Sequence, residues 1–497
     1  MRLGGVLNLL GKLIIILSLV LLTPIPFSLY YHDGMVQSFV LCSSLGLLLG
    51  GLLVLIFLPE KELGYKEGFA IVVFSWLVLA LLGALPFYLS GCLNSFIDCF
   101  FESMSGFTTT GSTILSKIEV LPRSVLFWRM LTHWLGGMGI ILLTLAILPL
   151  LGIGGMQLYQ AEMPGPTKDR LAPRIQDTAR ILWSVYLLLT VIETILLMLG
   201  GLDFFDAVTH SFATLATGGF SNHSESIAYF NSLYVESVIV VFMVLAGMNF
   251  ALHFHALRGR RKVYWKSEEV RFYLSLILGT TALIAAANMV SGTYTNLGSN
   301  LRDTLFQVVS IITTTGFGTA DFDGWVPVCG VMLVALMFVG GCAGSTGGGI
   351  KVIRFLLFFK YARLQLRQLI HPRQVLTVKL EEAKVANDVL IAILGYFGIY
   401  LVFFLVASLL VTGCGVDIVT GLTAVIATLN NIGPGLHLVG PTQNFGHLPA
   451  AAKLVLIFCM LAGRLELYTV VILLTPEYWH SGRRPRLRFA RRKENHD

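Results

Sequence analysis

The segment VVSIITTTGFGTADF (308–322) decides the fold, because three related segments occur elsewhere in the chain. These read ESMSGFTTTGSTI (102–114), HSFATLATGGFS (210–221) and TAVIATLNNIGPGL (423–436). If Gly111, Gly218, Gly316 and Gly433 are taken as equivalent, the segments recur about every hundred residues, and a regular period of this kind sets the architecture of a chain.

Long apolar runs flank each of these glycines. The preceding runs cover roughly 67 to 90, 181 to 201, 270 to 291 and 385 to 412, and the following runs cover roughly 124 to 150, 233 to 257, 326 to 361 and 450 to 475. Because about 20 apolar residues cross a bilayer as a helix, we predict four repeats of helix, re-entrant pore loop and helix. Two further apolar runs before Pro59 predict two N-terminal transmembrane helices, which gives ten spanning helices.

The stretches just before the glycines, such as 94 to 108 and 203 to 215, are too short to span the membrane. They begin with Asn94, Asp203, Asn300 and Asp417, residue types that commonly cap helices, so half-helices are expected. The predicted fold is an all-α polytopic membrane protein with pseudo-four-fold symmetry. Its parts are two N-terminal helices (1–60), repeats one (61–150), two (151–258), three with a broken second helix (259–372) and four (373–480), and a basic tail (481–497).

The composition supports a membrane protein. Hydrophobic residues make up 55% of the chain and charged residues 13%, and the mean hydropathy is +0.78. The net charge of +7 comes mostly from basic residues between apolar runs, a pattern that predicts cytoplasmic loops, with both termini cytoplasmic, and not a nucleic-acid partner. The basic loop 258–271 and the tail 483–493 suit either anionic membrane lipids or an acidic face of a cytosolic partner. The seven cysteines are scattered and lack the spacing of a metal site or redox pair.

The glycine turns favour a cation as the ligand. Non-helical backbone at membrane depth must line water or be buried in protein, so four such turns should converge on a cavity. Half-helices with their C-terminal ends aimed inward add partial negative charge there, and carbonyl and threonine oxygens can replace the hydration shell of a cation.

A second glycine-rich segment interrupts the apolar run that follows the third repeat loop. It reads GGCAGSTGGG (340–349), and we interpret it as a flexible gate in a broken helix. The residues assigned to this gate are Gly340, Gly341, Gly344, Ser345, Thr346, Gly347, Gly348 and Gly349. Close helix packing remains an alternative, whereas a phosphate-binding loop is disfavoured because no strand precedes the segment.

Arg464 is expected well inside the bilayer, within the last apolar run. A charged group at this depth is costly and usually functional. We expect it to face the pore, where it repels cations at a constriction or tethers the glycine-rich segment. A structural ion pair is the alternative, although Glu466 is poorly placed to be its partner.

Several motifs together resemble the Trk/Ktr/HKT superfamily of K⁺ transport proteins, and most closely bacterial TrkH-type membrane subunits. The motifs are FESMSGFTTTGST (101–113), HWLGGMGI (133–140), LATGGFSNH (215–223), TTTGFGTADF (313–322), GGCAGSTGGGIK (340–351), LNNIGPG (429–435) and LAGRLELYT (461–469). The resemblance implies K⁺ binding in a filter formed by Thr110, Gly111, Thr217, Gly218, Thr315, Gly316, Ile432 and Gly433. The fourth repeat departs most from the pattern, because asparagine and isoleucine replace threonine.

The resemblance also implies the cellular setting. It predicts a homodimer in the bacterial inner membrane that is gated by a cytosolic nucleotide-binding partner of the TrkA type. Any nucleotide would act through that partner, with no covalent cofactor and K⁺ as the transported ion. A secondary transporter that couples K⁺ to H⁺ or Na⁺ remains the alternative. A membrane enzyme is disfavoured, because no HExxH or GxSxG motif occurs.

Overall fold

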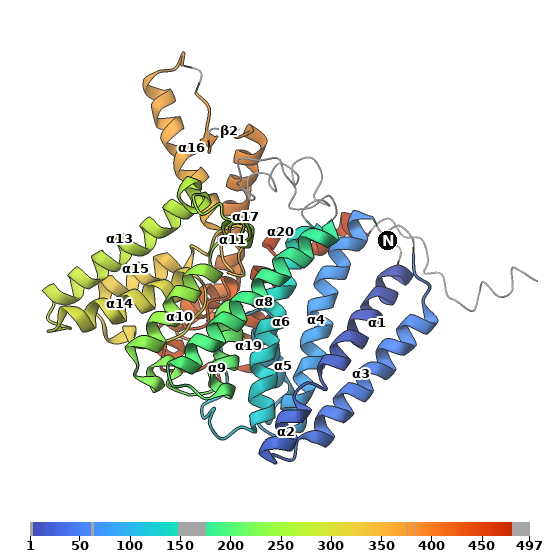
Figure 1. Ribbon diagram of the computed structural model, residues 1–497. Helices are drawn as coiled ribbons and strands as arrows, with labels where there is room; N and C mark the ends of the chain where they lie inside the picture. The colour runs from blue at the N-terminus through green and yellow to red at the C-terminus, as the bar shows by residue number, and fades with distance from the viewer. Residues whose placement is uncertain (1–2, 61–63, 148–174, 375, 382, 480–497) are drawn as a thin grey trace, which may run out of the picture.

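The computed structural model describes residues 3–60, 64–147, 175–374, 376–381 and 383–479, and its regular structure is almost entirely helical (Figure 1). The predicted tail at 481–497 lies outside these residues. Six of the described helices are long and apolar enough to cross a membrane, or eight if two bent pairs each count as one span. The chain is therefore a polytopic helical protein, with fewer continuous spans in its described part than the ten predicted.

The N-terminal part is a helical hairpin beside the rest of the bundle. Helix α1 (Leu3–Val20) turns at Pro24 into α2 (Ile25–Tyr31), and α3 (Val36–Ile56) returns along α1. The two long helices approach closely, since a Cβ on Gly11 would lie 2.8 Å from the Gly50 carbonyl oxygen. Small residues at such a crossing let helix backbones pack tightly within a membrane.

Four helices of 12 to 16 residues each follow a helix of at least 23 residues along the chain. The short helices are α5 (Phe96–Phe107), α9 (Phe204–Leu215), α14 (Leu297–Ile312) and α18 (Ile418–Leu429). The preceding helices are α4 (Tyr65–Leu89), α8 (Ile175–Leu199), α13 (Glu268–Val290) and α17 (Asn387–Gly413). The following helices are α6 (Arg123–Ile147), α10 (Leu233–Ala246), α15 (Pro327–Met337) and α19 (Ala450–Arg464).

Two of the predicted N-caps are correct. Asp203 accepts a hydrogen bond from the backbone N–H of Asp206, and Asp417 caps α18 in the same way. The predictions for Asn94 and Asn300 are wrong, because α5 begins after Ser95 and α14 begins a turn earlier, after Asn296. Sequence marks a capping residue type but not which of several nearby polar residues takes the role.

Three helices that follow the short ones are interrupted. Between α10 and α11 (Phe250–Leu257) the axis turns by 104°, and between α19 and α20 (Leu467–Leu474) it turns by 119°. The sequence predicted unbroken helices there. Asn249 starts α11 as an N-cap and Glu466 has a φ of 61°, so local side-chain and backbone chemistry ends each helix. Between α15 and α16 (Val352–Ile370) lies the glycine-rich segment.

The remaining elements are short. Helix α16 projects from the bundle beside a hairpin of β1 (Lys379–Leu380) and β2 (Ala383–Lys384), which pair antiparallel (Figure 1). Helices α12 (Val263–Lys266) and α21 (Pro476–Trp479) are the other short helices among the described residues. Single 3-10 turns at Ser226–Phe230, Phe322–Gly324 and His437–Val439 lie in the connections after three of the short helices.

Candidate functional site

Each of the four short helices ends in the same kind of glycine turn. One glycine in every turn has a positive φ, and these four are called the ring glycines: Gly111 (80°), Gly219 (75°), Gly316 (85°) and Gly433 (108°). Two positions before each ring glycine, a residue other than glycine also has a positive φ: Thr109 (51°), Thr217 (54°), Thr314 (58°) and Asn431 (52°). A left-handed residue with a Cβ costs roughly 1–2 kcal/mol, so four at one position indicate a functional constraint.

Backbone hydrogen bonds fix the register of the four turns. The residue before each ring glycine donates its N–H to a carbonyl in the last turn of the short helix: Thr110 to Ser105, Gly218 to Ala213, Thr315 to Ser310 and Ile432 to Ala427. Gly218 is therefore the counterpart of Thr110. The sequence had predicted Gly218 as the counterpart of Gly111, so the register of repeat two differs from the prediction by one residue. Gly219, and not Gly218, is the ring glycine, because it alone carries the matching positive φ.

The ring glycines close a circle of contacts. A Cβ on Gly111 would lie 2.1 Å from the carbonyl oxygen of Gly218, and a Cβ on Gly219 would lie 1.9 Å from that of Thr315. A Cβ on Gly316 would lie 1.9 Å from the carbonyl oxygen of Ile432. A Cβ on Gly433 would lie 3.1 Å from the carbonyl oxygen of Thr110. Each turn thus abuts the next one in chain order, and the last turn abuts the first.

Side chains join neighbouring turns of this ring. Asn431 donates to the Thr110 hydroxyl at 2.9 Å, and Ser112 donates to the Gly433 carbonyl at 2.8 Å. The Thr110 hydroxyl also lies 2.8 Å from that of Thr108, and the Thr315 hydroxyl lies 2.7 Å from that of Thr313. The bonds of Asn431 and Ser112 hold the first and fourth turns together, where the contact between ring neighbours is longest, whereas the two threonine pairs lie within single turns.

The segment 340–349, called the glycine loop, lies against the residues that support the ring. Thr346 donates its hydroxyl to the Leu215 carbonyl at 2.9 Å, at the end of α9. The Gly348 N–H donates to the Thr314 hydroxyl at 2.7 Å, and a Cβ on Gly348 would lie 2.4 Å from the Asn430 carbonyl. The loop therefore contacts the second, third and fourth turns at once.

The other predicted loop residues are held by neighbouring backbone. Gly340 donates to the Ile350 carbonyl at 2.9 Å, and Gly341 accepts from Val352 at 3.2 Å. The Gly344 carbonyl accepts from Phe250 at the start of α11 at 3.1 Å. Ser345 donates to the Cys342 carbonyl at 2.6 Å. Gly347 accepts from the Lys351 ammonium, and a Cβ on Gly349 would lie 3.1 Å from Gly340.

Arg464 ends α19 and is buried below the ring. Its guanidinium donates to the carbonyl of Thr346 at 2.7 Å and to that of Gly136 at 2.9 Å. Among the described residues no carboxylate pairs with Arg464. Glu466 pairs instead with Arg354, at 2.6 Å, so its expected poor fit as a partner for Arg464 holds.

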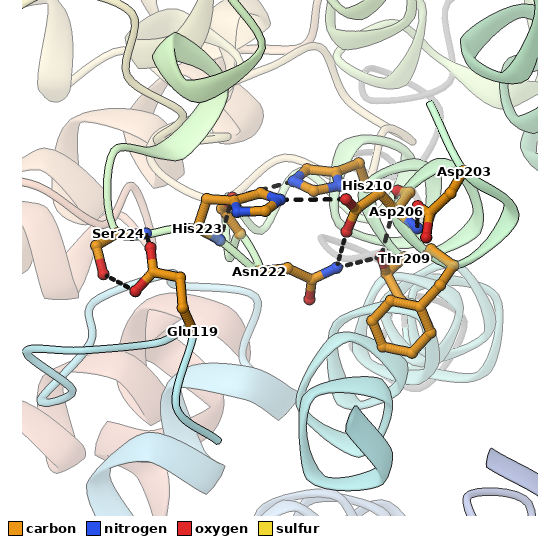
Figure 2. A network of polar contacts seen from close by, with 10 residues as sticks. Glu119, Asp203, Asp206, Thr209, His210, Asn222, His223 and Ser224 are labelled. Carbon is orange, nitrogen blue, oxygen red and sulfur yellow. Dashed lines mark hydrogen bonds and ion pairs between the residues drawn. The ribbon is translucent and has the colours of Figure 1, made fainter. Parts of the chain in front are cut away.

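The outer ends of the first two turns carry a polar network (Figure 2). Asp206 bonds His223 at 3.1 Å and Asn222 at 2.8 Å, and Glu119 accepts from the backbone and hydroxyl of Ser224. Burial alone would raise the pKa of Asp206, but the bond from His223, the nearby His210 and the bond from Asn222 lower it to about 2. The outer acidic residues of this network therefore hold backbone in place.

No group of three or more His, Cys, Asp or Glu residues suited to a metal ion occurs in the described part of the chain. The oxygens at the ring are instead backbone carbonyls and threonine hydroxyls, the ligand type of alkali-metal ions in transport proteins. A family model described as "TrkH: Cation transport protein" matches residues 35–481. This chain belongs to the TrkH family of cation transport proteins. It is a transport protein and not an enzyme.

Individual members of the TrkH family match over nearly their whole length. The Trk system potassium uptake protein TrkH of Escherichia coli K12 is 44% identical, over 96% of this chain and 100% of that protein. The protein of the same name from Vibrio parahaemolyticus is 42% identical, over 97% and 100%. The crystal structure of the potassium transporter TrkH from Vibrio parahaemolyticus superposes with a TM-score of 0.89 at 39% identity, and it covers 97% of this chain and 100% of that one.

One buried ion pair in this TrkH-family chain, between Arg129 and Glu102, was not predicted from the sequence. Arg129 on α6 bonds Glu102 on α5 at 2.7 Å, and both side chains are almost completely buried. Glu102 also accepts from the backbone of Ile114, while Arg129 donates to the carbonyl of Ser221 and stacks on Phe220. The pair thus connects the segments of chain that follow the first and second turns. The sequence does contain a signal for this pair, because Arg129 is a charged residue within an apolar run.

Proposed function

We propose that this chain conducts K⁺ into the bacterial cell as the ion-conducting subunit of a Trk-type uptake system in the inner membrane. The observation that carries the proposal is the closed order of contacts among the four ring glycines. In this proposal the short helices are re-entrant half-helices of four repeats around a pseudo-four-fold axis, with α1 to α3 added outside. The relatives named for potassium uptake agree with this assignment.

A filter at the ring would bind K⁺ through the carbonyls that precede the ring glycines, those of Thr110, Gly218, Thr315 and Ile432. Such oxygens replace the water lost from the ion. Each short helix ends just before its turn, so the partial negative charge of four helix C-termini would favour a cation and repel an anion. Gly218 and Ile432 offer no hydroxyl, so the second side of this filter relies on backbone alone and the fourth side on backbone and Asn431.

Below this filter the glycine loop and Arg464 would form the gate. In this proposal the contacts of the loop with three turns belong to the closed state, in which the guanidinium would also place positive charge near the ion path. We propose that a cytosolic nucleotide-binding partner of the TrkA type opens it. Helix α16 continues directly from the loop and projects from the bundle, which gives such a partner a mechanical connection. A homodimer with both termini cytoplasmic completes the assembly.

The test is ion flux into liposomes that contain the purified protein, with the membrane potential clamped. We expect potential-driven K⁺ flux without an H⁺ or Na⁺ gradient. Flux that requires such a gradient would favour coupled transport instead. The Arg464→Ala variant is measured in parallel, so that a closed gate does not hide a working filter. Absence of cation flux in both proteins would contradict the proposed function.

A further inference from the structure

The segment that follows each ring turn is hydrogen-bonded to the preceding short helix, and in three of the four turns the bond comes from the same helix position. Counted back equally from the ring glycines, this position holds Glu102, His210, Gln307 and Ala424. Glu102 accepts from the N–H of Ile114 at 2.9 Å, and Gln307 donates to the Ala320 carbonyl at 3.2 Å. Ala424 has no polar group, and the adjacent Thr423 accepts from the Leu436 N–H at 3.1 Å in its place.

In the second turn the anchor is a histidine whose two nitrogens have separate tasks. Nδ1 of His210 lies 2.8 Å from the Asp206 carbonyl, and a carbonyl can only accept, so Nδ1 carries the proton. Nε2 of the neutral ring is then an acceptor, and the Ser221 hydroxyl donates to it at 3.0 Å. The same hydroxyl oxygen accepts from the His223 N–H at 3.1 Å. Every proton in this chain of contacts is thereby assigned.

The rest of the segment that follows Gly219 is held by hydrogen bonds from α9 and from α6. Asn222 donates to Asp206 and to the Thr209 hydroxyl, at 2.8 and 2.7 Å, so three consecutive residues are bonded to the first turns of α9 (Figure 2). From the opposite side Arg129 donates to the Ser221 carbonyl at 2.8 Å. His210 is fully buried in the middle of this arrangement, close to the ring.

We propose that His210 is a positioning residue for ion selectivity, because its bond to Ser221 fixes the position of the segment that follows Gly219. This inference rests on the proposed filter function. It does not require His210 to touch the ion. Without the imidazole, Ser221 loses the acceptor of its hydroxyl, and the adjoining turn gains freedom to adapt to an ion of a different size.

The experiment compares K⁺ and Na⁺ flux in liposomes for His210→Ala, His210→Gln and wild type. Glutamine is the residue that this chain itself uses at the same position in α14, so it supplies an anchor of similar reach. We expect His210→Ala to lower the K⁺ to Na⁺ flux ratio about three- to tenfold, the effect of one lost hydrogen bond. His210→Gln should recover most of the ratio. His447→Ala, at an exposed histidine, is the control and should match wild type.

Each outcome is decisive. A folded His210→Ala protein with the wild-type ratio would overturn the inference, as would an equal loss of both fluxes at an unchanged ratio. If His210→Ala fails to fold, Ser221→Ala removes the other partner of the same bond and should lower the ratio in the same direction. Failure of the proposed function is a different result, because wild type would then pass no cation at all.

Discussion

The guanidinium of Arg464 donates to the carbonyl oxygen of Thr346 at 2.7 Å, which joins the end of α19 to the middle of the glycine loop. Its second bond, to Gly136, reaches α6. One side chain therefore holds the loop between two helices, and the described residues provide no carboxylate to neutralise it. Burying a cation in this way is expensive unless the protein uses its charge or its bonds.

Arg464→Ala should increase K⁺ flux in the absence of any partner protein. It removes two charge-assisted bonds, each of about 1.5–3 kcal/mol, so the closed arrangement loses most of its advantage and flux should rise by on the order of tenfold or more. Flux into liposomes at a clamped potential measures this. Arg464→Lys retains the charge but cannot span both carbonyls, so it separates tethering from repulsion. Unchanged or lower flux in a folded Arg464→Ala protein would contradict the gate.

Gly316→Ala should abolish selective K⁺ flux. Its Cβ would overlap the Ile432 carbonyl oxygen at 1.9 Å, and its φ of 85° is strained for alanine. Gly318→Ala is the matched control, because a Cβ there has open space and should leave flux unchanged. Purified variants are compared by K⁺ and Na⁺ flux after their folding has been checked by thermal unfolding. Equal flux in both variants would show that the ring is not the ion path.

Breaking the buried pair between Arg129 and Glu102 should destabilise the protein strongly. Removal of one partner leaves an uncompensated charge, so Glu102→Gln and Arg129→Met should each lower the free energy of unfolding by about 3–5 kcal/mol. The double variant should lose less than the sum. The pair of Lys360 with Glu268, in which both side chains are partly exposed, provides the comparison, and Lys360→Met should cost much less. Strictly additive losses would rule out direct coupling of Arg129 with Glu102.

The carboxylate of Asp206 should contribute stability that depends on acid pH. Its pKa of about 2 lies below the value for the unfolded chain, so the stabilisation is complete above about pH 4 and is lost as the pH falls through 2. The melting temperature in detergent should therefore differ between wild type and Asp206→Asn at pH 7, and the gap should shrink from pH 4 downwards. Asp388→Asn, at an exposed carboxylate, should show no such gap. A gap independent of pH would mean that the charge is not involved.

The sequence predicted the elements of this fold better than their ends. The short helices and the interrupted segment at 340–349 follow from composition, because glycine and small polar residues stand out in apolar surroundings. The bends before Phe250 and at Glu466 were not predicted. Asn249 and Glu466 do interrupt the apolar sequence there, but the N-cap geometry of Asn249 and the ion pair of Glu466 with Arg354 are formed only in the folded protein. Hydropathy measures transfer into the membrane and carries no information on the direction of a helix axis.

The same limit explains the one-residue error in the second turn. The pair Thr217–Gly218 matches the threonine–glycine pairs of the first and third turns by residue type, but Gly218 faces His133, whose Nδ1 would lie 2.1 Å from a Cβ there. Glycine is required at Gly218 by packing and at Gly219 by φ. Sequence shows two glycines and cannot tell which constraint belongs to which. The hydrogen bond from Gly218 to Ala213 settles the register.

The circular order of the ring glycines also has a consequence for the biogenesis of the protein. Ser112 and Gly433, which meet where the circle closes, are 321 positions apart in the sequence. Chains are made and generally fold from the N-terminus, so about two thirds of the protein is synthesised between the first turn and the last. During that time Ser112 and Thr110 lack their partners, and a truncated chain can never supply them. The ring can therefore close only after the fourth turn has been inserted, and a chain that ends before Gly433 cannot complete the proposed ion path.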